Sequence, residues 1–116
     1  MRLKGLLYEG YRDNHHKQIL LEIRKDRYFL LYKSGISYTE IDITQKVDEL
    51  CEGLLRMNIV EWNQNHYDSG MDSFPHYNWR LSVSFDDVMV QCNGSSNFPT
   101  NWDEFVLLFR GIGIRL

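Results

Sequence analysis

The sequence predicts an α+β domain in which an antiparallel sheet of about five to six strands carries two amphipathic helices on one face. Several segments alternate between apolar and polar residues, which is typical of strands with one buried face. Two other segments repeat apolar residues at helical spacing. The content of 43% hydrophobic and 14% aromatic residues is enough to form a core. With 116 residues, we expect a single domain that spans residues 1–116.

The first 43 residues predict three strands and a short extended segment. Apolar residues alternate with polar ones, and polar turns separate the segments. The strands are expected at residues 3–11, 19–24 and 28–32, with turns at residues 13–16 and 25–26 and an extended segment at residues 36–43.

A helix is expected after Thr44, which is a suitable N-cap residue. Its apolar face is formed by residues at i, i+3, i+4, i+7 and i+8, namely Val47, Leu50, Cys51, Leu54 and Leu55. Residues 59–62 predict a fourth strand, and residues 63–77 predict a long irregular loop.

The last third of the chain predicts a hairpin followed by a second helix. Residues 79–85 and 88–92 alternate as two strands around Asp86 and Asp87, and residues 93–97 form a loop in which Gly94 admits positive φ. Thr100 and Asp103 have the spacing of a capping box. Gly111 can end the helix in the left-handed conformation.

The two halves of the chain share a pattern that indicates a possible β-β-α pseudo-repeat. The hairpins predicted at residues 19–29 and 79–89 both precede a helix with an Asp-Glu pair in its first turn. Duplication explains this pattern, and so does physical convergence, because acidic residues suit any helix N-terminus.

The C-terminal third resembles a group of small, mostly uncharacterised bacterial proteins. The resemblance rests on a strand that begins with Trp, an acidic turn, a Gly-Ser-x-Asn-x-Pro loop and a helix with Trp and Phe. The matching residues are Trp79, Asp86, Asp87, Gly94, Ser95, Asn97, Pro99, Trp102 and Phe105. The resemblance implies a bacterial context and supports the fold, and it implies no activity.

Charge is distributed unevenly along the chain. Residues 1–33 carry eight Lys and Arg against four Asp and Glu, whereas residues 34–109 carry three against twelve. This basic excess is smaller than that of a general nucleic-acid binder, so we do not expect nucleic acid as a partner.

No apolar run is long enough to span a membrane, and the N-terminus lacks the pattern of a signal peptide. Cys51 and Cys92 are expected to be buried thiols in a reducing cytoplasm, with a disulfide as the alternative. We therefore expect a cytoplasmic protein.

The loop at residues 63–77 contains a possible metal-binding set, His66, Asp68, Asp72 and His76. Imidazole nitrogen and carboxylate oxygen are suitable ligands for zinc or iron. Their spacing matches no established ligand pattern, and a solvated surface loop is the alternative interpretation.

The same region is rich in aromatic residues, of which Trp62, Tyr67, Phe74 and Tyr77 are candidate partner-binding residues. Aromatic side chains among Asn, Ser and Gly on a rigid scaffold are typical of recognition surfaces. For Trp62, a position in the core is the alternative.

The sequence therefore favours a non-catalytic cytoplasmic interaction or accessory protein that binds a protein partner or itself and needs no cofactor. The aromatic loop at residues 62–79 is the candidate surface, and the charged N-terminal hairpin is a second candidate. The alternative is a metal-dependent hydrolase or another small enzyme that uses the His66–His76 loop.

Overall fold

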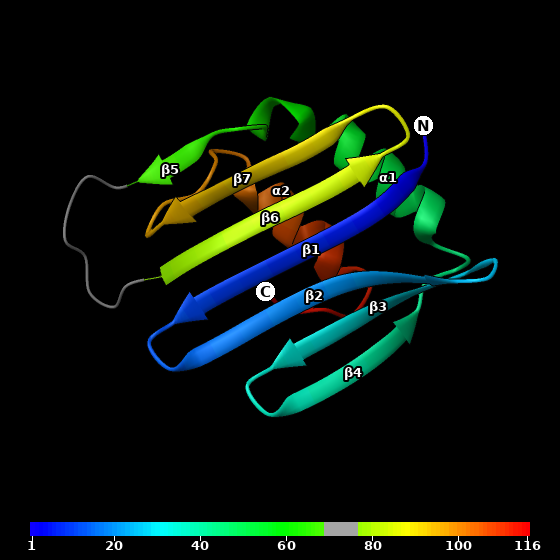
Figure 1. Cartoon of the computed structure of the whole chain (residues 1–116), viewed down its shortest axis with the longest axis horizontal. Helices are drawn as coiled ribbons and strands as arrows, with labels where there is room; N and C mark the ends of the chain where they lie inside the picture. The colour runs from blue at the N-terminus through cyan, green and yellow to red at the C-terminus, as the bar shows by residue number, and fades with distance from the viewer. Residues whose placement is uncertain (69–76) are drawn as a thin grey trace.

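The computed structural model describes residues 1–68 and 77–116. The described chain is 49% strand and 21% helix. Its elements are, in order, β1 (Leu3–Arg12), β2 (His15–Arg24), β3 (Arg27–Ser34), β4 (Ser37–Asp42), α1 (Val47–Arg56), the 3₁₀-helix η1 (Ile59–Trp62), β5 (His66–Asp68), β6 (Tyr77–Phe85), β7 (Met89–Ser95) and α2 (Trp102–Arg110). The strands form one sheet in the order β4-β3-β2-β1-β6-β7-β5, and α1 and α2 lie behind it (Figure 1).

The predicted fold class is wrong in the composition of the sheet. The sheet has seven strands instead of five or six, and it is mixed because β5 runs parallel to β7. The segment predicted as a fourth strand is the 3₁₀-helix η1, and β5 follows it inside the predicted loop. A three-residue strand is too short to show an alternating pattern, so periodicity could not reveal it.

The predicted pseudo-repeat is not a repeat of structure. The hairpin β2–β3 is separated from α1 by β4, which pairs with β3 at the edge of the sheet. The hairpin β6–β7 is followed by α2 with no strand between them, and β7 pairs with the earlier strand β5. The two hairpins lie on either side of β1, which pairs with β2 and with β6.

The core lies between the sheet and the helices, and aromatic rings dominate its centre. Phe105 of α2 is fully buried, and its ring centroid lies 5.7 Å from that of Trp62 and 4.8 Å from those of Trp102 and Phe109. These ring pairs add orientation-dependent attraction to the large apolar area that they bury. The contacts hold η1 and α2 together over the sheet.

Gly94 lies in β7 and does not have the predicted positive φ. Glycine is needed at this position because a side chain would collide with Trp79. A Cβ atom at this position would lie 2.3 Å from Nε1 of Trp79, which is closer than real contacts allow. The absent side chain lets the Trp79 indole lie across β7 and donate a hydrogen bond to the carbonyl of Asn97 (2.8 Å).

The ends of both helices differ from the predicted ends. The N-cap of α2 is Asn101 and lacks a side-chain cap hydrogen bond, so the predicted capping box is not formed. The Asn101 side chain instead accepts a hydrogen bond from Trp62 and donates one to the carbonyl of Met57. Gly111 has φ −63, and the glycine with positive φ that follows α2 is Gly113, with φ 105.

Thr44, the N-cap predicted for α1, closes the end of the β3–β4 hairpin. Its hydroxyl donates to Oδ1 of Asp42 (2.6 Å) and accepts from the backbone N–H of Tyr28 (3.0 Å). The N-cap of α1 is Lys46. The Thr44 hydroxyl therefore bonds to the backbone of β3 and to Asp42 of β4, and not to the free N–H groups at the start of α1. Helix propensity alone cannot decide between these two sets of partners.

Replacing Phe105 by alanine is expected to lower the free energy of unfolding by about 3–5 kcal/mol, because it opens a cavity at the centre of the aromatic core. Leu107, on the same helix but 60% exposed, provides the control, and Leu107→Ala is expected to cost less than about 0.5 kcal/mol. Urea denaturation measures both values. Equal effects of the two substitutions would contradict the described packing of α2.

The carboxylate of Asp42 is expected to make the free energy of unfolding depend on pH in the acidic range. Hydrogen bonds from Thr44, together with the Arg27 guanidinium, lower the pKa of Asp42 from 3.8 to about 2. A carboxylate with a lowered pKa stabilises the fold above its unfolded pKa, and this contribution is lost as the pH falls through the folded pKa.

Asp42→Asn should therefore be less stable than the wild type at pH 7, and the difference should shrink between about pH 4 and pH 2. Urea denaturation at pH 7, 4 and 2 measures this difference. If the stability difference between Asp42→Asn and the wild type is the same at pH 7, 4 and 2, the ionised carboxylate of Asp42 does not stabilise the fold.

Candidate functional site

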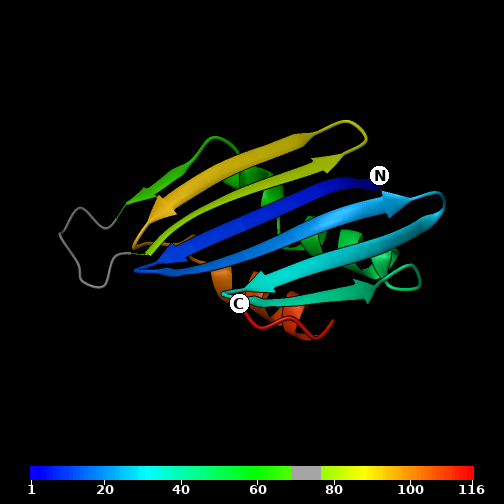
Figure 2. The ribbon, with the colours of Figure 1, turned by 60° about the horizontal axis from the view of Figure 1, so that its bottom comes forward.

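The sheet has a face that no helix covers in the described structure, here called the open face (Figures 1 and 2). Strand alternation sends Leu7, Leu20 and Leu31 to this face. Leu7 pairs with Leu20 and Leu20 pairs with Leu31, so the three form an apolar row across β1, β2 and β3. Leu20 is 38% exposed, and the other two are half-buried. Contiguous leucines on a solvated sheet face are unusual, because such faces are normally polar.

On one side of this row, the open face carries a charged cluster centred on Glu9. Glu9 is the only buried charged residue in the described part of the chain. It accepts hydrogen bonds from the Tyr11 hydroxyl and from Nη2 of Arg80, both at 2.7 Å. The ring of His16 stacks on Tyr11 with centroids 4.4 Å apart. The cluster therefore presents an exposed guanidinium and an aromatic pair, held in place by one buried carboxylate.

Hydrogen bonding keeps this carboxylate ionised. Burial raises the pKa of Glu9, but the hydrogen bonds from Tyr11 and Arg80 outweigh burial, so its pKa lies below the usual range. The same hydrogen bond from Tyr11 to Glu9 raises the pKa of Tyr11. At neutral pH the cluster therefore contains a carboxylate, a guanidinium and a neutral phenol.

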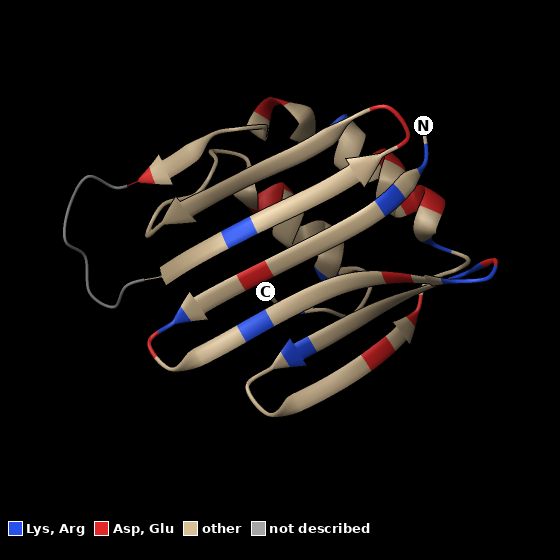
Figure 3. Ribbon diagram, viewed as in Figure 1, with Lys and Arg blue, Asp and Glu red and all other residues tan. Residues whose placement is uncertain are grey.

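On the other side of the row, Arg24 organises a second charged cluster. Its guanidinium donates to Glu22 (2.8 Å) and to Glu40 on the edge strand β4. It also lies over the ring of Phe29, 4.5 Å from the centroid. Figure 3 shows acidic and basic positions on neighbouring strands of the sheet. The open face thus has an apolar centre between two groups of paired charges.

The aromatic residues predicted to bind a partner pack inward where the structure describes them. Trp62 is 3% exposed and donates to Asn101. Tyr67 is half-buried and stacks on Trp79. Tyr77 is half-buried, and its hydroxyl bonds to that of Tyr8. Phe74 lies outside the described residues.

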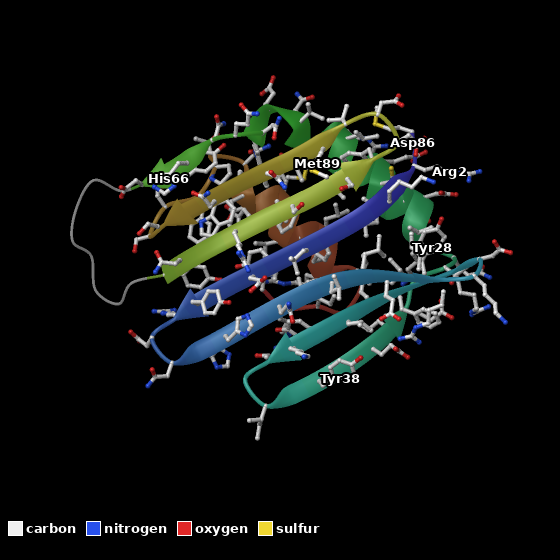
Figure 4. The ribbon with its side chains drawn as sticks, viewed as in Figure 1. Arg2, Tyr28, Tyr38, His66, Asp86 and Met89 are labelled. Atoms are coloured by element: carbon white, nitrogen blue, oxygen red, sulfur yellow. The ribbon has the colours of Figure 1, made fainter. Side chains whose placement is uncertain are left out.

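Of the predicted metal-binding residues, His66 and Asp68 are exposed neighbours on β5. The Nε2 atom of His66 lies 4.0 Å from Oδ2 of Asp68, and its Nδ1 atom pairs with Asn93. Figure 4 shows His66 at one edge of the sheet and Tyr38 near the opposite edge. Asp72 and His76 lie outside the described residues. Within residues 1–68 and 77–116, no three His, Cys, Asp or Glu side chains are placed to hold a metal ion.

Both cysteines are buried, as predicted, and neither is activated. Burial raises the pKa of Cys92 to about 12 and also raises that of Cys51. Both thiols are therefore protonated at neutral pH, and a protonated thiol is a poor nucleophile.

Comparison with known proteins finds no matching family model, no matching curated protein and no matching solved structure. Where the chain is described, no helix has the length and apolar character needed to cross a membrane.

The interpretation of the sequence named the charged N-terminal hairpin as a candidate surface, but it missed the leucines of the open face, although the sequence contains a signal for them. Leu7 and Leu20 occupy the side of their strands opposite to the buried residues Leu6 and Ile19. An apolar residue on both sides of a strand indicates either burial on both faces or a binding surface. Only the position of the helices distinguishes these two cases.

Proposed function

We propose that this protein is a non-catalytic cytoplasmic interaction module that binds a protein partner through its open face. The observation that carries the proposal is the apolar row Leu7–Leu20–Leu31 between the Glu9 and Arg24 clusters. An apolar centre with a polar, charged rim is the usual anatomy of a protein–protein interface. Arginine and tyrosine, which occur in these clusters, are among the residues that contribute most to binding free energy.

The charged clusters are held in place before any partner arrives. Glu9 fixes Arg80 and Tyr11, while Glu22 and Glu40 fix Arg24. Long side chains lose rotamer freedom when they enter an interface, and fixing them beforehand lowers that entropic penalty. The ion pairs of Arg24 with Glu22 and Glu40 are exposed on both sides and add little to stability, so their arrangement fits recognition better than folding.

The expected occupant is a protein surface with an apolar centre and flanking charges of both signs. The paired charges of the open face give it little net charge of either sign. Nucleic acid would instead require an uncompensated basic surface. A second copy of the chain is the competing occupant, since a face with both signs can complement itself across a two-fold axis.

Leu20→Glu is expected to weaken partner binding at least about tenfold, because it places a charge in the apolar centre. Leu107→Glu is the matched control, since Leu107 is also an exposed leucine but lies on α2. The partner is identified by cross-linking in the native cell, then purified, and the dissociation constants of the reconstituted complex are measured by calorimetry. Circular dichroism checks that both variants remain folded.

The outcomes separate the possible occupants. A stoichiometric complex that Leu20→Glu weakens and Leu107→Glu leaves intact supports the proposal. A purified chain that sediments as a dimer, and that Leu20→Glu alone converts to a monomer, identifies a second copy as the occupant. Equal binding by both variants would exclude the open face.

The contact between His66 and Asp68 favours a second candidate, a metal-dependent hydrolase or other small enzyme that also uses Asp72 and His76. The two functions predict different responses to metal, because a ligand that binds only the folded state raises its melting temperature. Under the first proposal, we expect zinc and manganese to leave the melting temperature unchanged in differential scanning fluorimetry. A rise that His66→Ala or His76→Ala abolishes would support the enzyme instead.

A further inference from the structure

A cleft of about 980 Å³ lies on the side of the sheet opposite to the open face. The strands β1 and β2 extend past α2 toward their connecting turn, so α2 does not cover this end of their helix-side surface (Figure 2). The floor of the cleft includes Tyr8 and Gly10 of β1 and Tyr77 of β6, and its walls include Phe98 and Trp102. Its volume is that of a typical small-molecule site.

Two tyrosine hydroxyls meet at the floor of this cleft. Tyr8 and Tyr77 reach toward each other over Gly10 and form a hydrogen bond. A Cβ atom at Gly10 would lie 2.5 Å from the Tyr77 hydroxyl and 2.8 Å from the Tyr8 hydroxyl, so only glycine leaves room for the pair. Burial raises the pKa of both phenols, which keeps them protonated.

The tyrosine pair has one hydrogen atom to offer. One hydroxyl donates to the other, and the proton of the accepting hydroxyl has no acceptor within the described residues. The pair therefore presents a donor to the cleft, strengthened because the same oxygen already accepts a hydrogen bond. A ligand that accepts a hydrogen bond would complete this arrangement.

Basic side chains surround the same space. Arg12 and Lys17 line the cleft, and neither forms an ion pair with a carboxylate in the described part of the chain. The positive charge of Arg12 lowers the pKa of Tyr77, although burial raises this pKa by more. His15 also lines the cleft and contacts Ser34. Asp13, in the turn between β1 and β2, brings an opposing negative charge to the cleft.

The walls of the cleft are aromatic and fixed by mutual packing. The ring of Phe98 lies 5.5 Å from that of Tyr77 and 4.9 Å from that of Trp102, and Trp102 packs in turn on Tyr8. Rings held in this way offer faces and edges to a planar apolar ligand without further ordering.

We propose that this cleft binds a small aromatic carboxylate, with its ring against the wall formed by Phe98 and Trp102 and its carboxylate toward Arg12, Lys17 and the tyrosine pair. Charge-assisted hydrogen bonds from the two cations and the phenol would hold the anion, and the aromatic walls would hold the ring. The site lies on the opposite side of the sheet from the open face, so it goes beyond the proposed function and does not depend on it.

The probe for this site is 2-naphthoate, and its neutral isostere 2-naphthamide tests the need for charge. Each is titrated into the isotopically labelled full chain, and chemical shifts in the amide and indole N–H spectrum report the site and the affinity. We expect saturable shifts of the Trp102 indole with 2-naphthoate and at least tenfold weaker binding of 2-naphthamide.

Variants then test the individual groups. We expect Arg12→Gln and Lys17→Gln to weaken 2-naphthoate binding at least about tenfold, and Tyr77→Phe to weaken it about fivefold. Asp13→Asn should tighten it, since it removes the opposing charge, and asparagine suits the positive φ of residue 13. Arg110→Gln and Lys33→Gln are matched controls on exposed cations outside the cleft and should leave the affinity unchanged.

Four results would overturn the proposal. They are the absence of saturable binding, equal affinities for the acid and the amide, shifts confined to the open face, and an affinity unaffected by Arg12→Gln. Arg12 is exposed, so its substitution does not endanger the fold, and a folded variant with unchanged affinity is directly interpretable.

Discussion

The packing of α2 on the sheet through Phe105 is the interaction on which the rest of the structure depends. This fully buried ring packs on Trp62 of η1, on Trp102 and Phe109 of its own helix and on Tyr8 of β1, and it thereby connects η1, α2 and the sheet. Because α1 and α2 both lie behind the sheet, they bury one of its faces and leave the other open (Figure 1). Two helices of ten and nine residues cannot cover both faces of a seven-stranded sheet.

The open face combines apolar leucines with exposure to water, because no helix of the described structure covers it. An uncovered sheet face must be compatible with water, yet it carries three leucines in a row. Paired charges on both sides of the row limit the apolar area, and the hydrogen bonds around Glu9 allow a buried carboxylate to remain ionised. A surface built in this way is stable when free and still retains an apolar centre that a partner can cover.

The cleft on the helix side of the sheet exists because α2 is shorter than the strands on which it packs. The ten residues of β1 extend about 33 Å, whereas the nine residues of α2 extend about 14 Å. A helix shorter than the strands beneath it leaves part of their surface uncovered. At this end of the sheet the uncovered surface holds the half-buried Tyr77, whose hydroxyl bonds over Gly10 to the buried Tyr8, with Arg12 and Lys17 nearby. The length mismatch thus exposes polar groups that a fully covered sheet could not accommodate.

The sequence by itself determined most strands and both α-helices, because those elements depend on local periodicity. It did not determine η1 or β5, since β5 exists only through its pairing with β7. Thr44 was assigned to a helix cap for a similar reason, because its hydroxyl bonds to the backbone of Tyr28, which is far away in the chain. The N-cap of α2 was likewise placed at Thr100, whereas the structure has Asn101 there, with its side chain bonded to Met57. Only the tertiary structure decided that Trp62 is in the core and that Leu20 faces solvent. Periodicity identifies the two sides of a strand, but the side that becomes buried is decided by where the helices pack.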